Sequence, residues 1–260
     1  MSVLKRNEIH LWLVEDQSVT DPDLLAAYLK TLSKDESQRH ERLIFPRHRQ
    51  QFLVSRALLR SVLADYLQIK PEEVRFAKNA YGKPRIASFD QEYPLSFNLS
   101  HTNELSVLAI SSGNELGVDV EYLTRKVDIL KLARRYFSPL ETEALQKLDV
   151  SQFNDRFFYL WTLKEAYIKA CGMGLAIPLK DFSFSFTGSQ VEVSFVEDRQ
   201  DNPDNWRFWQ YRFKQQFQIA LALKQDDGDR NKKIRMQLGV PLQGFSSCSA
   251  ELLFSSPQQN

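Results

Sequence analysis

The stretch WTLKEAYIKACGMGLAIPL, residues 161–179, is the part of the chain from which fold and chemistry can best be predicted. Glu165 and Lys169 stand four positions apart, so on a helix their carboxylate and ammonium groups share one face. An ordinary ion pair on a solvated helix would show the same spacing. Gly172 and Gly174 follow, and glycine with a positive φ is typical of a helix end. The stretch therefore predicts a helix with a charged face that stops near Gly172.

The stretch GVDVEY, residues 117–122, indicates a strand with two different faces. Val118 and Val120 alternate with Asp119 and Glu121, which sends both valines to one side and both carboxylates to the other. An amphipathic strand with a polar outer face is the ordinary explanation. Taken with the charged helix, however, this strand places acids and lysines where a divalent cation and a phosphate group would be bound.

Both stretches belong to a set of motifs that follow one another in a fixed order. The motifs are YGKP (81–84), FNLSHT (97–102), GVDVE (117–121), RYFSPLE (135–141) and WTLKEAYIK (161–169). In type and order they resemble the 4′-phosphopantetheinyl transferase superfamily, specifically its larger, surfactin-synthetase-activating (Sfp-type) branch. The resemblance covers roughly residues 30–225.

Composition excludes several classes of protein. The 260 residues suffice for one large or two small domains, and 34 basic against 33 acidic residues argue against a general nucleic-acid binder. Cys171 and Cys248 lack metal-ligand spacing, which fits a reducing compartment. The first residues lack a signal-peptide pattern, and no apolar run approaches the roughly 18 residues of a membrane span. We expect a cytoplasmic protein with no membrane or nucleic-acid partner.

Hydrophobic periodicity divides the chain into two halves with the same order of elements. The expected helices cover residues 22–32, 35–67 (interrupted near Pro46), 128–135, 138–148 and 152–171. Stretches with strand periodicity follow the helices in each half and end in LSVLAIS and FQIALAL. This repeated order predicts an α+β fold with a boundary near residue 114.

The resemblance implies two similar subdomains related by pseudo-twofold symmetry, each a small antiparallel sheet with a long helix, and a ligand between them. We expect residues 1–114 to form the N-terminal subdomain and residues 115–225 the C-terminal subdomain with the metal site. The polar run that follows Lys224 predicts a linker and a C-terminal tail over residues 226–260.

The resemblance also implies an activity. Members of the family transfer the 4′-phosphopantetheine arm of coenzyme A to a serine of an apo acyl or peptidyl carrier protein and release adenosine 3′,5′-bisphosphate. Such a reaction asks for a divalent cation on the pyrophosphate, further cations for the remaining charge, and a base for the serine proton. We expect Mg²⁺, with Mn²⁺ as an alternative, coenzyme A as co-substrate, and a monomeric enzyme.

The resemblance assigns three carboxylates to the metal. Asp119, Glu121 and Glu165 match the metal ligands of the family position by position. Mg²⁺ prefers oxygen ligands and keeps some waters, so these acids and pyrophosphate oxygens would complete its shell. Glu121 is the weaker match, since some relatives carry a non-acid there. Lys169 matches a lysine that contacts the pyrophosphate.

For the base, the resemblance offers two carboxylates. We favour Glu165 and place Glu141, in RYFSPLE, second. Lys164 keeps two interpretations open, a contact with phosphate or carrier and a salt bridge near the acidic strand. Trp161 is expected to pack beneath the helix and hold its charged side chains in register.

Contacts with coenzyme A are expected mainly in the first half. Ser100 and His101 match a serine–histidine pair whose histidine is directed at the 3′-phosphate. Lys83, in YGKP, matches a position beside the adenine or its phosphates. For the 3′-phosphate we also expect cations that precede the long helix: Arg39, Arg47 and Arg49. Glu36 stands where some relatives carry lysine, a departure from the family pattern.

The surface for the carrier protein is expected on residues 127–148, through Lys131, Leu132, Arg134 and Phe137. The same residues would also suit a core and an ordinary surface.

Two other functions compete with the transferase. A non-catalytic binder of carrier protein or coenzyme A would have no need of Asp119, Glu165 and Lys169, and a magnesium-dependent phosphohydrolase would release the nucleotide without any carrier.

Overall fold

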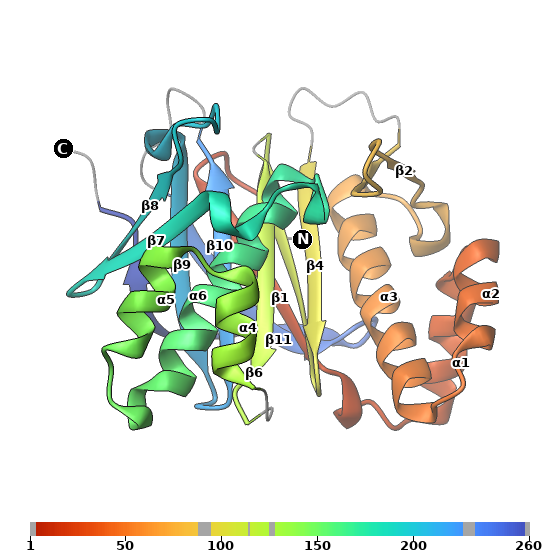
Figure 1. The fold of residues 1–260 in the computed structure, drawn as a ribbon. Coiled ribbons are helices and arrows are strands. Elements are labelled where there is room, and N and C mark those ends of the chain that lie inside the picture. Colours follow the sequence, from red (N-terminus) through yellow and green to blue (C-terminus); the bar gives the residue numbers. More distant parts are fainter. Residues whose placement is uncertain (1–3, 88–94, 114, 125–127, 226–231, 258–260) are drawn as a thin grey trace. The chain divides into compact units, whose positions relative to one another are not determined.

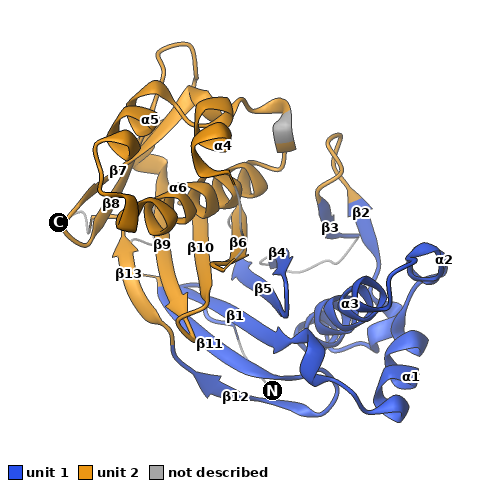
Figure 2. Ribbon diagram, turned by 60° about the horizontal axis from the view of Figure 1, so that its bottom comes forward, with its two compact units in different colours: residues 1–77, 84–113, 233–249 blue, residues 78–83, 114–232, 250–260 orange. Residues whose placement is uncertain are grey.

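The computed structural model describes residues 4–87, 95–113, 115–124, 128–225 and 232–257. They form two compact units, which Figure 2 distinguishes by colour. Unit 1 comprises residues 1–77, 84–113 and 233–249, and unit 2 comprises residues 78–83, 114–232 and 250–260. Each unit combines one large sheet with one long helix, so the predicted α+β class is confirmed (Figure 1). Among the described helices, none has both the length and the apolar character needed to cross a bilayer.

Unit 1 is built on a five-stranded sheet in the order β12-β11-β1-β5-β4. Its strands are β1 (Glu8–Glu15), β4 (Leu95–Thr102), β5 (Leu105–Ser112), β11 (Lys233–Val240) and β12 (Gly244–Cys248). All neighbouring pairs are antiparallel except β1 and β11, which run parallel. A purely antiparallel sheet was expected, so this parallel pair is a difference from the prediction.

Three helices belong to unit 1: α1 (Pro22–Thr31), α2 (Lys34–Arg42) and α3 (Pro46–Leu67). Pro46 starts α3, as the predicted interruption indicated. Leucines, valines and alanines of α3 pack against β1 and β5 and form the core of the unit. Short segments complete the unit: η1 (Asp16–Ser18), η2 (Pro71–Glu73) and a ribbon of β2 (Phe76–Lys78) and β3 (Pro84–Ile86).

Unit 2 is built on a six-stranded sheet in the order β6-β10-β9-β13-β8-β7. Its strands are β6 (Leu116–Tyr122), β7 (Phe182–Thr187), β8 (Gln190–Phe195), β9 (Trp206–Phe213), β10 (Phe217–Lys224) and β13 (Glu251–Ser255). Its helices are α4 (Ile129–Tyr136), α5 (Pro139–Gln146), α6 (Val150–Cys171) and the short η3 (Gly174–Ala176), η4 (Leu179–Asp181) and η5 (Pro203–Asn205). Helix α6 lies across the sheet, as Figure 2 shows.

Helix α6 ends where the glycines predicted. Gly172 follows its last residue with a φ of 68°, and Gly174 also has a positive φ, 55°. A side chain at Gly172 would be strained by that φ and would meet Lys83 Cδ at 2.6 Å. The end of α6 is therefore determined both by backbone conformation and by close packing.

The prediction of a linker and tail for residues 226–260 does not hold for residues 233–255. They form β11 and β12 in unit 1 and β13 in unit 2. The parallel pairing of β11 with β1 joins Glu8 to Lys233, at opposite ends of the sequence. Such pairing depends on partners distant in the chain, which the local sequence pattern does not reveal.

Candidate active site

Asp119 and Lys169 form an ion pair in unit 2. Strand β6 and helix α6 touch at Gly117, where a Cβ atom would lie only 2.0 Å from the carbonyl oxygen of Ala166. Asp119 follows two residues later on the same face, with 5% of its surface exposed. The Nζ atom of Lys169 lies 2.6 Å from its Oδ1 atom. The close contact between strand and helix therefore brings the two predicted residues together.

Glu165 lies one turn before Lys169 on α6 and is electrostatically coupled to the pair. Burial, with a smaller contribution from the negative charge of Asp119, raises the pKa of Glu165 to about 7, and this value already includes the opposing effect of Lys169. Two carboxylates and one ammonium group thus share a partly buried site. The carboxyl group of Glu165 can hold or release a proton near neutral pH.

Glu121 follows Asp119 on the same face of β6, directly opposite Gln218 of β10. Within the described residues, no three His, Cys, Asp or Glu side chains converge as a ready-made metal site. Mg²⁺ does not need one, because proteins commonly hold it with one or two carboxylates together with substrate phosphates and waters. Asp119 and Glu165 offer such oxygens, and their repulsion is of the kind that a divalent cation relieves. The donor set fits Mg²⁺.

Glu141 and Lys164 require a correction, because they form a buried structural pair. Lys164 Nζ lies 2.8 Å from Glu141 Oε2 and donates to the carbonyl oxygens of Leu179 and Phe182. Glu141 also accepts from the N–H groups of Ser138 and Phe184. The two side chains are at most 1% exposed. Glu141 is therefore not placed to take a proton from substrate, and Lys164 is not placed to meet a phosphate.

Trp161 packs as predicted, on the aromatic cluster beneath α6. Its ring stacks on Phe157 at 5.8 Å and meets Tyr136 edge-on at 5.7 Å. The indole lies one turn before Glu165 and stabilises that part of the helix. Its contacts are all with the core, which fits a supporting function.

The predicted carrier surface, residues 127–148, is only partly at the surface. Phe137 is 1% exposed and belongs to the core, and Leu132 packs partly against it. Lys131 and Arg134 are exposed on α4. Val127 lies outside the described residues. Of the four side chains named in the prediction, Lys131 and Arg134 are accessible to a partner, whereas Phe137 and Leu132 pack in or against the core.

The predicted contacts for coenzyme A in unit 1 lie on β4 and around the start of α3. His101 is exposed near the end of β4, whereas the preceding Ser100 is buried. Arg39, Arg47 and Arg49 are exposed. Their guanidinium groups contact, respectively, the ring of Phe52 at 5.4 Å, Glu104 at 3.3 Å and the carbonyl oxygen of Leu43 at 2.9 Å.

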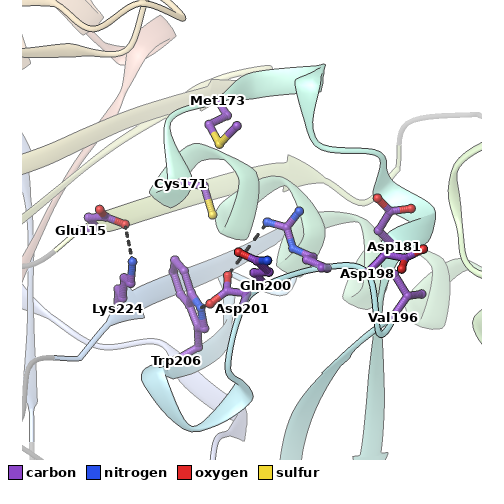
Figure 3. Close-up of a pocket in the computed structure, with 11 residues that line it drawn as sticks. Glu115, Cys171, Met173, Asp181, Val196, Asp198, Gln200, Asp201, Trp206 and Lys224 are labelled. Atoms are coloured by element: carbon purple, nitrogen blue, oxygen red, sulfur yellow. Dashed lines mark hydrogen bonds and ion pairs between the residues drawn. The ribbon is translucent and has the colours of Figure 1, made fainter.

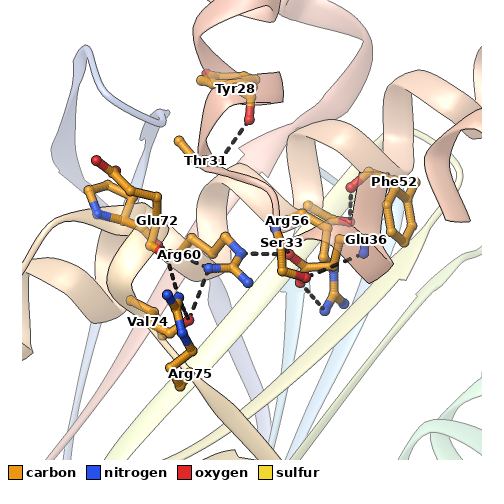
Figure 4. Close-up of polar contacts among 12 residues, drawn as sticks. Tyr28, Thr31, Ser33, Glu36, Phe52, Arg56, Arg60, Glu72, Val74 and Arg75 are labelled. Atoms are coloured by element: carbon orange, nitrogen blue, oxygen red, sulfur yellow. Dashed lines mark hydrogen bonds and ion pairs between the residues drawn. The ribbon is translucent and has the colours of Figure 1, made fainter. Parts of the chain in front are cut away.

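Glu36, the departure from the family pattern, has a structural explanation (Figure 4). Its Oε2 atom lies 2.6 Å from Nε of Arg60, which is 1% exposed, and its Oε1 atom lies 3.8 Å from Arg56. The same carboxylate completes a capping box with Ser33 at the start of α2. Glu36 therefore balances buried positive charge and fixes the helix end.

Lys83 belongs to unit 2 and contacts the end of α6. Its Nζ atom donates to the carbonyl oxygens of Ala170 at 2.7 Å and Leu116 at 3.1 Å. Burial lowers the pKa of this ammonium group. Two of its three donors thus join the last turn of α6 to the start of β6, which gives Lys83 a structural function in this unit.

A cavity of unit 2 with a volume of about 650 Å³ is lined by none of the predicted site residues (Figure 3). Cys171, Met173, Trp206 and Lys224 are among its lining residues. Asp201, also in the lining, already accepts from the Trp206 indole N–H at 3.0 Å and from a tyrosine hydroxyl at 2.6 Å. The candidate site is therefore identified by its side-chain chemistry and not by this cavity.

A polar layer beneath α6 was missed by the sequence analysis. Gln218 and Gln210 are both 0% exposed on the inner faces of β10 and β9. Arg212 Nε donates to Gln218 Oε1 at 3.1 Å, and Gln210 Nε2 donates to Thr162 Oγ1 at 2.8 Å. The signal was present in WRFWQYRF, where Gln210 and Arg212 stand two positions apart, and in FQIALAL, where Gln218 is the one polar residue of an apolar strand.

Comparisons with known proteins identify the family of the chain. Residues 20–113 match a family model described as 4′-phosphopantetheinyl transferase, N-terminal, and residues 115–222 match one described as 4′-phosphopantetheinyl transferase superfamily. Among solved structures, holo-[acyl-carrier-protein] synthase of Thermotoga maritima is 17% identical and covers 53% of this chain and 84% of its own. Its TM-score of 0.34 is too low to support any argument.

Two curated relatives are considerably more similar. The 4′-phosphopantetheinyl transferase Sfp of Bacillus subtilis is 32% identical over 59% of this chain and 71% of its own length. The 4′-phosphopantetheinyl transferase HetI of Nostoc sp. is 40% identical over 72% of this chain and 78% of its own length. With the two family models, this similarity shows that the chain belongs to the 4′-phosphopantetheinyl transferase superfamily.

Proposed function

We propose that the cluster of Asp119, Glu165 and Lys169 is the reaction centre of a 4′-phosphopantetheinyl transferase. The enzyme moves the phosphopantetheine arm of coenzyme A to a serine of an apo carrier protein and releases adenosine 3′,5′-bisphosphate. The observation that carries this proposal is the coupling of two carboxylates and a lysine in one partly buried site. A purely structural ion pair would need only one of the two acids.

Asp119 and Glu165 would hold Mg²⁺, with Glu121 as a third ligand or one that acts through water. The bound ion would neutralise pyrophosphate charge and stabilise the leaving group. The close contact at Gly117 supports this assignment, because it fixes the strand that carries Asp119 against the helix that carries Glu165. Mn²⁺ accepts the same oxygen donors and should replace Mg²⁺.

Glu165 is the proposed base for the serine hydroxyl. A carboxylate that gives one oxygen to a metal ion keeps a second oxygen, which can accept the serine proton. Glu141 is no longer a competitor, because it is buried against Lys164. Glu165 accepts the proton directly or through one water molecule.

Lys169 is the proposed cation for the pyrophosphate. Its side chain is 28% exposed, in contrast to the 7% of Asp119, so Lys169 is the more accessible member of the pair. A lysine has three donors and a flexible stem, which allows it to keep Asp119 and contact a phosphate oxygen. In unit 1, exposed His101 with Arg39, Arg47 and Arg49 are the proposed contacts of the 3′-phosphate.

Intact-mass spectrometry tests the proposal against the alternatives. An apo acyl carrier protein is incubated with coenzyme A and Mg²⁺, with and without this protein. The transferase predicts a mass increase equal to one phosphopantetheine arm, abolished by EDTA. No increase on several unrelated carriers would favour the non-catalytic binder, and free adenosine 3′,5′-bisphosphate formed without a carrier would identify a phosphohydrolase.

A further inference from the structure

Three polar side chains form a row across the sheet of unit 2. Gln218 of β10 is directly opposite Arg212 of β9 on one side and Glu121 of β6 on the other. These three strands are neighbours in the sheet (Figure 1). Residues directly opposite one another share a face and have Cβ atoms about 4.5–5.5 Å apart. Gln218 therefore lies between a guanidinium group and a carboxylate.

The amide of Gln218 is oriented by Arg212. Its Oε1 atom accepts a hydrogen bond from Arg212 Nε at 3.1 Å. Arg212 is itself held, since its Nη2 atom lies 3.3 Å from the hydroxyl of Tyr159 and 3.5 Å from Asp155 Oδ1. An amide flipped by 180° would set its NH₂ group against a guanidinium donor, which is unfavourable. The Nε2 atom of Gln218 therefore points away from Arg212.

The Nε2 atom of Gln218 needs an acceptor. The side chain is 0% exposed, and among the described residues this nitrogen has no hydrogen-bond partner. Buried amide donors are normally bonded, because they lose their water on folding. The next side chain in the row is Glu121, whose carboxylate is an acceptor.

We infer that Gln218 is a positioning residue for the metal site, whose amide donates to the carboxylate of Glu121 when that carboxylate turns toward a bound ion. This inference rests on the proposed function, in which Glu121 acts with Asp119 and Glu165. The row then connects the charge of Arg212 to the site through one amide. Removal of a group that orients a metal-binding carboxylate in this way commonly lowers metal affinity about 10- to 100-fold.

The test is Mn²⁺ binding to the protein alone, measured by electron paramagnetic resonance without coenzyme A or carrier. Gln218→Met keeps the length of the side chain but removes its donor. We expect Mn²⁺ affinity to fall about 10- to 100-fold. In a Glu121→Gln background the same substitution should have no further effect, which a merely structural glutamine would not show.

Gln210→Met is the matched control. Gln210 is equally buried in the same layer, but its partner across the strand is Ala220 and its amide donates to Tyr159 O and Thr162 Oγ1. This variant should lose stability and keep its Mn²⁺ affinity. Equal losses of affinity in both variants would show that any disturbance of the layer weakens the site, which overturns the inference.

The two proposals fail in different ways. A parent protein that binds no Mn²⁺, either alone or with coenzyme A added, overturns the metal assignment and this inference with it. Tight binding that Gln218→Met leaves unchanged overturns this inference alone. Should Gln218→Met not fold, the side-chain amide resonance of Gln218 in the ¹⁵N-glutamine-labelled parent protein is followed during Mg²⁺ titration, and a resonance that does not shift contradicts the inference.

Discussion

The Nζ atom of Lys164 lies 2.8 Å from Oε2 of Glu141, with both side chains buried, while the next residue along α6, Glu165, is coupled to Asp119. Adjacent positions of one motif thus have separate functions, because successive residues of a helix point about 100° apart. Lys164 joins α6 to η4 and to β7 through the carbonyl oxygens of Leu179 and Phe182. One side of α6 stabilises the unit, and the other carries the proposed chemistry.

Lys164→Met should destabilise the protein by about 3–5 kcal/mol, because it leaves the carboxylate of Glu141 buried without its counter-charge. The variant keeps the length of the side chain, so loss of volume is minor. Urea unfolding of the whole protein, followed by tryptophan fluorescence, measures the change. A variant that is as stable as the parent protein and has only a lower transfer rate would indicate that Lys164 takes part in the reaction.

Asp119→Asn and Glu165→Gln should each lower the rate of transfer by at least about 100-fold while the fold stays intact. Both substitutions keep the volume of the side chain and remove a charged oxygen ligand. Release of adenosine 3′,5′-bisphosphate measures the rate, and circular dichroism checks the fold. Glu143→Gln, an exposed acid paired with Lys147, is a suitable control. Full activity in either site variant would contradict the assignment of that residue.

Metal binding should depend on pH through Glu165. Its pKa is raised to about 7, so below that value a proton occupies the carboxyl group and must leave before an ion binds. We expect Mn²⁺ affinity to fall as the pH decreases, approaching about tenfold per pH unit below about pH 6. Glu165→Gln should bind more weakly and lose most of this dependence. A Mn²⁺ affinity of the parent protein that does not change with pH would contradict the raised pKa of Glu165.

How far the site can be predicted from the sequence depends on how local its geometry is. The polar faces that carry Asp119 and Lys169 were predicted because strand alternation and the four-residue helical spacing are local properties, whereas the functions of these residues were implied by the resemblance. The burial of Lys164 was not, because it depends on carbonyl groups of a segment that begins at Leu179. The pairing of β11 with β1 spans nearly the whole chain, so no local pattern indicated it. Interactions between distant segments account for most of the differences.

Asp16→Asn should stabilise the protein at alkaline pH. Asp16 is 0% exposed and accepts from Ser106 Oγ at 2.8 Å and Gln51 Nε2 at 3.2 Å. Burial raises its pKa from 3.8 to about 7. The folded state therefore holds this proton more tightly than the unfolded state, and stability falls as the pH rises from about 4 to about 7.

The asparagine variant does not titrate, so it avoids this loss. Above pH 7 it should exceed the parent protein in unfolding free energy by up to about 4 kcal/mol, less the cost of its altered hydrogen bonds. Near pH 4 the advantage should disappear. Urea titrations of both proteins at several pH values measure the difference, and an advantage that does not change with pH would exclude the titration of Asp16 as its cause.

Gly117→Ala should disturb the fold and the site together. A Cβ atom at this position would lie 2.0 Å from the carbonyl oxygen of Ala166 and 2.4 Å from the backbone nitrogen of Ala170. Backbone atoms of α6 cannot rotate away as a side chain can, so the helix must move from β6. Overpacking of this kind typically costs about 1–3 kcal/mol. Because Asp119 and Lys169 sit on the two displaced elements, transfer should fall by more than the fraction of unfolded protein explains. The transfer rate per folded molecule separates the loss of folded protein from the disturbance of the site. Gly188→Ala, at a turn where an added Cβ meets no other atom, is the comparison. If Gly117→Ala and Gly188→Ala have equal rates per folded molecule, the contact between β6 and α6 supports the fold without setting the geometry of the site.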